Sequence, residues 1–114
     1  MSQDPPVISD AYQLSLSLFH RTKGFTKHLR PTLGRRLEEA SLELLVLLRN
    51  FSFSKDKIQR KQTLALCSQR LDEIRLLTQL SFDLKALTPA SYQEVAEFSS
   101  CVGKQIGGLL KSVR

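Results

Sequence analysis

The chain has 114 residues, enough for one compact domain and rarely for two. Hydrophobic residues make up 41% and charged residues 25%, which is typical of a soluble globular protein, and no apolar run reaches the ~18 residues that a membrane span needs. The formal net charge of +6 favours a polyanionic partner, with nucleic acid ahead of an anionic membrane surface. A basic surface without such a partner is the alternative on charge alone.

The first predicted helix covers about residues 8–23, where apolar and small residues recur at helical spacing. Ser9 or Asp10 is expected to cap its start, and Gly24 to end it. These signals favour an amphipathic helix at the start of the domain.

The second predicted helix covers about residues 31–51 and begins with Pro31, whose missing N–H costs nothing in a first helical turn. Its main apolar stripe is Leu33, Leu37, Ala40, Leu44, Leu47, Leu48 and Phe51, and its additional apolar residues are Leu42, Leu45 and Val46. These exceed the three positions in seven that one buried helix face needs. We therefore expect packing on two sides, either within the bundle or against another subunit.

The third predicted helix covers about residues 55–87, with Ser54 as its N-cap and two separate apolar stripes. The fourth covers about residues 89–112, with Thr88 as N-cap and Pro89 in its first turn. Gly103 and Gly107 interrupt it at a cost of up to ~1 kcal/mol each, so we expect close packing there.

Four amphipathic helices with short joints predict an all-α fold, an antiparallel up-down-up-down four-helix bundle formed by the single domain 1–114. The two cysteines, Cys67 and Cys101, lie far apart without a nearby histidine, which excludes a typical zinc site. Both fall on apolar helical stripes, so we expect reduced core residues. The N-terminal "MSQDPPVISD" lacks the features of a signal peptide, so we expect a cytoplasmic protein with no membrane partner.

The candidates for catalysis are weak. Arg21 and His28 have the spacing of the Arg-x(4–6)-His signature of HEPN ribonucleases, but Gly24 lies between them and favours a turn. The glutamates of the second predicted helix have no nearby histidine for a di-iron site, and arginines beside them explain them as surface ion pairs. We therefore predict no enzyme activity, no cofactor and no metal.

The basic residues are distributed unevenly. From Ala11 to Leu37 the sequence has no acid, and a second basic cluster follows between Lys55 and Lys61. In an antiparallel bundle these clusters lie at opposite ends, with Arg70 and Arg75 between them, so the set could follow a phosphate backbone. The candidate contacts to nucleic acid or a partner are Arg30, Arg35, Arg36, Lys57, Arg60, Lys61 and Arg70. An ordinary solvated surface is the alternative.

Three segments resemble one known family. They are "RPTLGRRL" (30–37), "RLDEIRLL" (70–77), and Tyr92 followed by "GKQIGGLLKS" (103–112). In this order they look like the four-helix-bundle family that includes the accessory variability determinant of diversity-generating retroelements and proteins encoded in ribosomal-RNA intervening sequences. The resemblance covers about residues 10–112.

The resemblance implies an up-down bundle that assembles as a homopentameric barrel with a basic surface. It also implies a non-enzymatic accessory protein that binds nucleic acid (RNA, DNA or both) and the reverse transcriptase of the element. The retroelement member is needed for the mutagenic copying of a template RNA into cDNA. A structural protein of the intervening-sequence type, with unknown partner, and a HEPN-like ribonuclease remain as alternatives.

Individual positions carry this resemblance. The family pattern Arg-x-Thr-Leu-Gly-x-Arg-Leu is matched by Arg30, Thr32, Leu33, Gly34, Arg36 and Leu37. Gly103 and Gly107 match its small residues near the C-terminus. Arg35 departs from the family, where an acid such as Asp is expected, and makes this segment more basic.

Overall fold

The fold is known from a computed structural model that describes residues 5–113. Within that range lie four α-helices and no strand: α1 (Pro6–Thr22), α2 (Arg35–Phe53), α3 (Lys57–Asp83) and α4 (Pro89–Ser112). A π-helical turn, η1 (Arg30–Gly34), leads directly into α2. The all-helical architecture predicted from the sequence is therefore confirmed for these residues.

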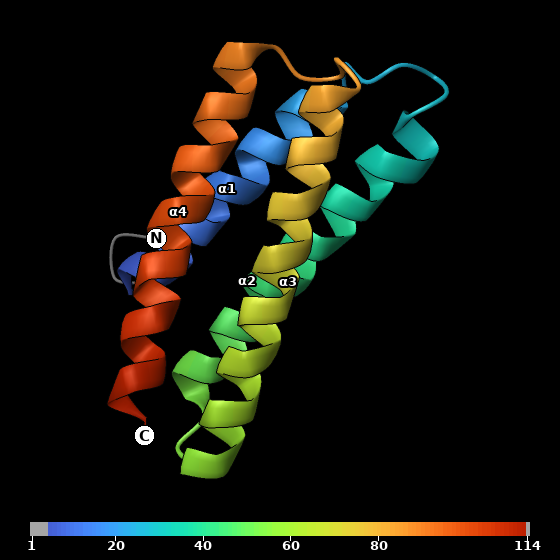
Figure 1. The fold of residues 1–114 in the computed structure, drawn as a ribbon. Coiled ribbons are helices and arrows are strands. Elements are labelled where there is room, and N and C mark those ends of the chain that lie inside the picture. Colours follow the sequence, from blue (N-terminus) through green and yellow to red (C-terminus); the bar gives the residue numbers. More distant parts are fainter. Residues whose placement is uncertain (1–4, 114) are drawn as a thin grey trace.

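Each helix has two main neighbours. α1 contacts α2 and α4, and α3 contacts the same two helices. Figure 1 shows the α1–α2 and α3–α4 connections at one end of the molecule and the α2–α3 connection at the other. The bundle is elongated, with extents of 43 × 25 × 20 Å.

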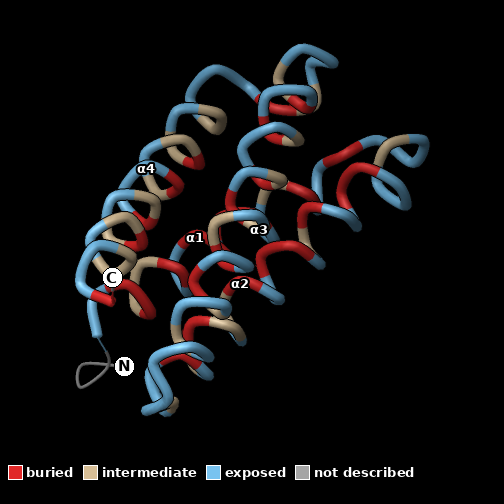
Figure 2. Tube along the Cα trace, turned by 60° about the horizontal axis from the view of Figure 1, so that its bottom comes forward, coloured by how far each residue is buried: buried red, intermediate tan, exposed pale blue. Residues whose placement is uncertain are grey.

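A stripe of buried residues on each helix faces the bundle interior, as the buried positions in Figure 2 show. The largest fully buried apolar side chains are Ile8, Leu14, Leu18, Leu37, Leu44, Leu48, Leu64, Ile74, Val95 and Val102. With 17 residues, α1 is the shortest α-helix of the described range and begins partway along the bundle. Beyond its start, Phe51, Leu64 and Val113 form a second, smaller core cluster.

The start of α1 differs from the predicted one. α1 begins at Pro6 after Pro5, so Ser9 and Asp10 lie inside the helix and cap nothing. A proline fits the first helical turn because that turn needs no N–H donor. The prediction relied on a capping side chain, whereas Pro5 at the N-cap position makes no side-chain cap hydrogen bond. Residues 1–4 of the N-terminal segment, in which no signal peptide is predicted, lie outside the described range.

The ends of α3 also differ from the prediction. Asp56, not Ser54, caps its start, because its carboxylate accepts a hydrogen bond from the Gln59 N–H at 3.3 Å. The helix stops at Asp83, and Lys85 takes the left-handed conformation (φ 64°) that reverses the chain. Thr88 caps α4 as predicted, accepting from the Ser91 N–H at 3.1 Å.

The start of α2 is a π turn built around a glycine. The Gly34 N–H donates to the Leu29 carbonyl, five residues back, at 3.1 Å. Gly34 is buried, and a Cβ on it would lie 3.4 Å from the Phe25 ring and 3.5 Å from Thr22. The glycine inside "RPTLGRR" therefore lets the α1–α2 connection approach the helix closely.

Two of the three glycines of α4, Gly103 and Gly107, have different surroundings. A Cβ on Gly103 would collide with the guanidinium of Arg75, which confirms the predicted close packing at this position. A Cβ on Gly107 would have no neighbour within 4 Å, so the same prediction is wrong there. Nothing in the described residues explains Gly107.

The two cysteines also differ. Cys67 is buried, as predicted, and burial raises the pKa of its thiol to about 12. The prediction of a core position is wrong for Cys101, which is exposed on α4 and donates to the Asp10 carboxylate at 3.4 Å. The hydrogen bond to Asp10 is the main reason that the pKa of Cys101 is raised.

We expect a thiol reagent such as DTNB, at about pH 8, to label one thiol of the folded protein, Cys101, because the thiolate is the reacting species and Cys67 is buried. Asp10→Asn removes the carboxylate charge, lowers the pKa of Cys101 and should speed its labelling. Cys101→Ser is the control that should abolish the fast reaction. Rapid labelling of Cys67 in folded protein would contradict the burial of its thiol.

Candidate nucleic-acid interface

One end of the bundle carries cations that pair with no described residue. Lys23, Lys27 and Arg30 lie in or beside the α1–α2 connection, and Lys85 lies in the adjacent α3–α4 turn. All four residues are exposed, and none makes an ion pair within residues 5–113. Their charges are therefore available to a ligand at this end.

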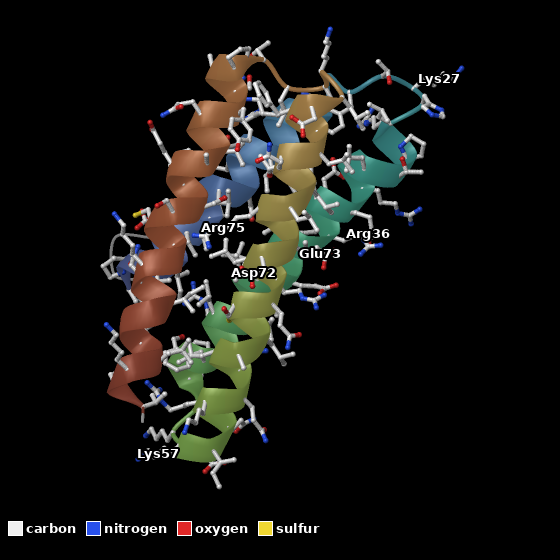
Figure 3. All side chains as sticks on the ribbon, viewed as in Figure 1. Lys27, Arg36, Lys57, Asp72, Glu73 and Arg75 are labelled. Atoms are coloured by element: carbon white, nitrogen blue, oxygen red, sulfur yellow. The ribbon has the colours of Figure 1, made fainter. Side chains whose placement is uncertain are left out.

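The opposite end carries a second group of exposed lysines. Lys55, Lys57 and Lys61 surround the start of α3, and none pairs with a described acid. Figure 3 shows Lys27 and Lys57 at the two extremes of the bundle. The placement of the two basic clusters at opposite ends follows the expectation from the sequence.

Arg60 has contacts inside the protein. Its guanidinium lies 4.0 Å from the centroid of the Phe51 ring. It also donates to the carbonyls of Phe51 at 3.3 Å and Ser54 at 2.8 Å, at the end of α2. The last carbonyls of a helix have no hydrogen-bond donor within the helix, and Arg60 provides donors at this helix end. Of the sequence candidates, this residue is the one with a clear structural task in the α2–α3 joint.

Three other candidates lie in ion pairs on the outer α2–α3 surface. Arg36 binds Glu73 at 2.9 Å, and Arg70 contacts Glu43 at 3.3 Å and Glu73 at 3.4 Å. Arg35 pairs with Glu39 on the next turn at 3.0 Å. The Arg35–Glu39 pair is exposed and the others are partly exposed, so each contributes little stability, but together they neutralise much of the charge between the two ends.

Arg75 does not extend the basic surface along α3 as expected. Its guanidinium lies against α4, where it donates to the Ser99 carbonyl at 3.3 Å and occupies the space left by Gly103. In the middle of α3, Arg70 is therefore paired with carboxylates, and the guanidinium of Arg75 lies against α4.

Arg21 joins α1 to α4. Its guanidinium binds Glu94 at 2.8 Å, and the hydroxyl of Ser17 donates to the same carboxylate at 2.6 Å. The Ser17 hydrogen bond, followed by that of Arg21, lowers the pKa of Glu94. His28 lies in the exposed α1–α2 connection. The residues suggested for a ribonuclease site therefore have separate surroundings, and Arg21 has a partner on α4.

The outer α2–α3 surface contains two apolar grooves. The sequence predicted only that these helices have more apolar residues than one buried face needs. One is lined by Leu42, Glu43, Val46, Leu47, Leu66 and Arg70. The other is lined by Leu29, Pro31, Thr32, Leu33, Arg35, Arg36, Leu77, Leu80 and Leu84. Val46 is 59% exposed and Leu66 is 45% exposed, so the first groove is not covered within one chain.

Comparison with models of known protein families gave no match, and comparison with curated protein sequences gave none either. Among residues 5–113, no group of three or more His, Cys, Asp or Glu side chains is placed to hold a metal ion. No helix in the same range is both long enough and apolar enough to cross a membrane.

The two kinds of cation at the α2–α3 end should respond differently to truncation. Arg60→Ala is expected to lower the free energy of unfolding by about 1–2 kcal/mol, because it removes a ring contact and two carbonyl partners. Lys57→Ala, at an exposed position without a partner, should change it by less than about 0.5 kcal/mol. Urea unfolding followed by circular dichroism measures both. Equal effects would contradict the structural role of Arg60.

Proposed function

We propose that the protein is a non-enzymatic accessory factor of a diversity-generating retroelement. It binds nucleic acid and the reverse transcriptase of the element in the cytoplasm, and it supports mutagenic cDNA synthesis. The ordered match of three segments to that family supports the retroelement assignment. The four-helix architecture is consistent with it.

The observation that carries nucleic-acid binding is the placement of unpaired cations at both ends of the bundle. Lysines without acidic partners retain their full charge for phosphate groups, whereas Arg35, Arg36 and Arg70 already have carboxylate partners. Contacts of this kind give affinity without sequence reading and weaken as salt rises. Of the seven candidates from the sequence, Arg30, Lys57 and Lys61 therefore stand as the principal phosphate contacts.

The proposed assembly is a homopentamer whose subunits meet through the outer α2–α3 surface. Its two apolar grooves offer buried area to a second copy. The ion pairs between the grooves leave this surface close to neutral, so two chains of net charge +6 meet there with the least repulsion. The free lysines at the two ends stay exposed in such an assembly.

Nucleic-acid binding should depend on where charge is removed. Two triple variants, Lys23/Lys27/Arg30→Gln and Lys55/Lys57/Lys61→Gln, each remove three free charges. Each should weaken binding. Each should also make the negative slope of log K against log [salt] less steep, by about 0.7–0.9 for each phosphate group that the variant no longer neutralises. Fluorescence anisotropy with a labelled oligonucleotide, over a range of salt concentrations, measures this slope.

The matched comparison is Arg35/Arg36/Arg70→Gln, which also removes three charges but from residues that are ion-paired. Its effect on the slope should be smaller, and light scattering must give it the same mass as the unchanged protein, because these arginines line the grooves of the proposed subunit surface. Equal effects in all three variants would mean that total charge, not its placement, determines binding. Affinity that ignores salt would contradict the electrostatic account altogether.

The retroelement assignment has its own discriminator. A neighbouring reverse-transcriptase gene and a repeated variable region, followed by co-purification of the two proteins, separate it from the intervening-sequence alternative. RNA that stays intact with the purified protein removes the ribonuclease alternative.

The assembly surface is tested by charge insertion. Val46→Glu or Leu66→Glu places a carboxylate in the first groove and should convert the oligomer to monomer, as measured by light scattering. Leu76→Glu is the control, since Leu76 is 70% exposed on α3 and lines neither groove. An unchanged mass for both groove variants would place the subunit contact elsewhere.

A further inference from the structure

A small cavity lies between α3 and α4, in the half of the bundle nearer the α3–α4 turn. Its lining residues are Arg75, Thr78, Gln79, Tyr92, Ala96 and Ser99. Figure 3 places Arg75 between the ends that carry Lys27 and Lys57. The cavity shares no lining residue with the two grooves of the α2–α3 surface, so it is a separate feature of the molecule.

Three contacts bound the cavity. The Tyr92 hydroxyl donates to the Gln79 side-chain oxygen at 3.2 Å, and the Tyr92 ring stacks on Phe82 with centroids 4.6 Å apart. On the other side, Arg75 donates to the Ser99 carbonyl at 3.3 Å. Any side chain at position 103 would collide with that guanidinium, so Gly103 allows Arg75 its position. All of these contacts lie within one chain, so the cavity forms without a second subunit.

The lining of the cavity includes two buried hydroxyl groups without partners. Thr78 is 3% exposed and Ser99 is 2% exposed. Neither Thr78 Oγ1 nor Ser99 Oγ has a hydrogen-bond partner among the described residues. Buried polar groups in proteins are nearly always satisfied, so two such groups lining one cavity indicate that something else supplies their partner.

The free groups of the cavity are mainly donors. Arg75 keeps most of its five N–H donors, Gln79 keeps its amide N–H groups, and each hydroxyl can donate once. No carboxylate lines the cavity, and Asp72, on the preceding turn of α3, makes no ion pair with Arg75. A positive charge with converging donors matches an anion that carries several acceptor oxygens.

We propose that this cavity binds a small oxyanion, a phosphate or carboxylate group, with Arg75 as its charged partner and the hydroxyls of Thr78 and Ser99 as further donors. The site goes beyond the proposed function, since it uses none of the free lysines. Two sources present this chemistry: a free anion, and the terminal phosphate of a nucleic-acid strand.

The test is an NMR titration of the 15N-labelled protein with inorganic phosphate and, separately, with acetate. Sodium chloride at matched ionic strength is the reference for screening. We expect saturable shifts at the Arg75 Nε and at the backbone amides of Thr78 and Ser99. Oligonucleotides with a 5′-phosphate and with a 5′-hydroxyl distinguish the two sources, because only the phosphorylated strand should shift Arg75 if the ligand is a strand end.

Variants assign the donors. Arg75→Gln should weaken phosphate or acetate binding by about tenfold or more, since it removes a charge-assisted hydrogen bond. Ser99→Ala, which removes one hydroxyl from a buried site, should weaken it by about threefold. Lys104→Gln removes a charge from α4 outside the cavity and should leave the affinity within about twofold.

Several results would overturn the proposal. They are shifts that chloride reproduces, shifts centred on the lysines of the two ends, or the same affinity for Arg75→Gln and the unchanged protein. After any of these results, an ordered water would be the remaining partner for the two hydroxyls. If Arg75→Gln fails a thermal-melting check of its fold, Ser99→Ala carries the test, and wild-type affinity for that variant overturns the proposal.

Discussion

The packing of α3 against two neighbours is the constraint on which the rest of the structure depends. Its 27 residues correspond to about 40 Å of helix, close to the 43 Å length of the bundle. One side of α3 meets α2 and another meets α4. Its length therefore separates the two groups of free lysines by several Debye lengths at physiological salt, so each group acts on its own.

The interior of the bundle was predictable because a single physical signal determines it. Apolar residues at helical spacing placed Leu37, Leu44, Leu64 and Ile74 in the core, and all four are buried. Local cap chemistry also identified Thr88. The ends of α1 and α3 were less predictable, because several polar residues near each end could serve as the cap and only the folded backbone selects one.

The charge pattern of the candidate site was only partly predictable. Sequence order gives the two basic ends, since chain connectivity in an antiparallel bundle fixes which connections lie together. It does not give the Arg36–Glu73 and Arg70–Glu43 pairs, because each joins α2 to α3. Cys101 shows the same limit, since Asp10 reaches it from α1. Pairing across helices depends on side-chain register, which periodicity alone leaves open.

The two sides of α3 have different chemistry for a physical reason. On the α2 side, acids and arginines pair between apolar grooves, so that side has little net charge. On the α4 side, Gly103 brings a guanidinium close to α4 beside two hydroxyls without partners, so that side retains a charge and free donors. The first arrangement suits an apolar, like-charged neighbour, and the second suits an anion. A single helix therefore separates the surface proposed for assembly from the cavity proposed for an anion, and the two share no lining residue.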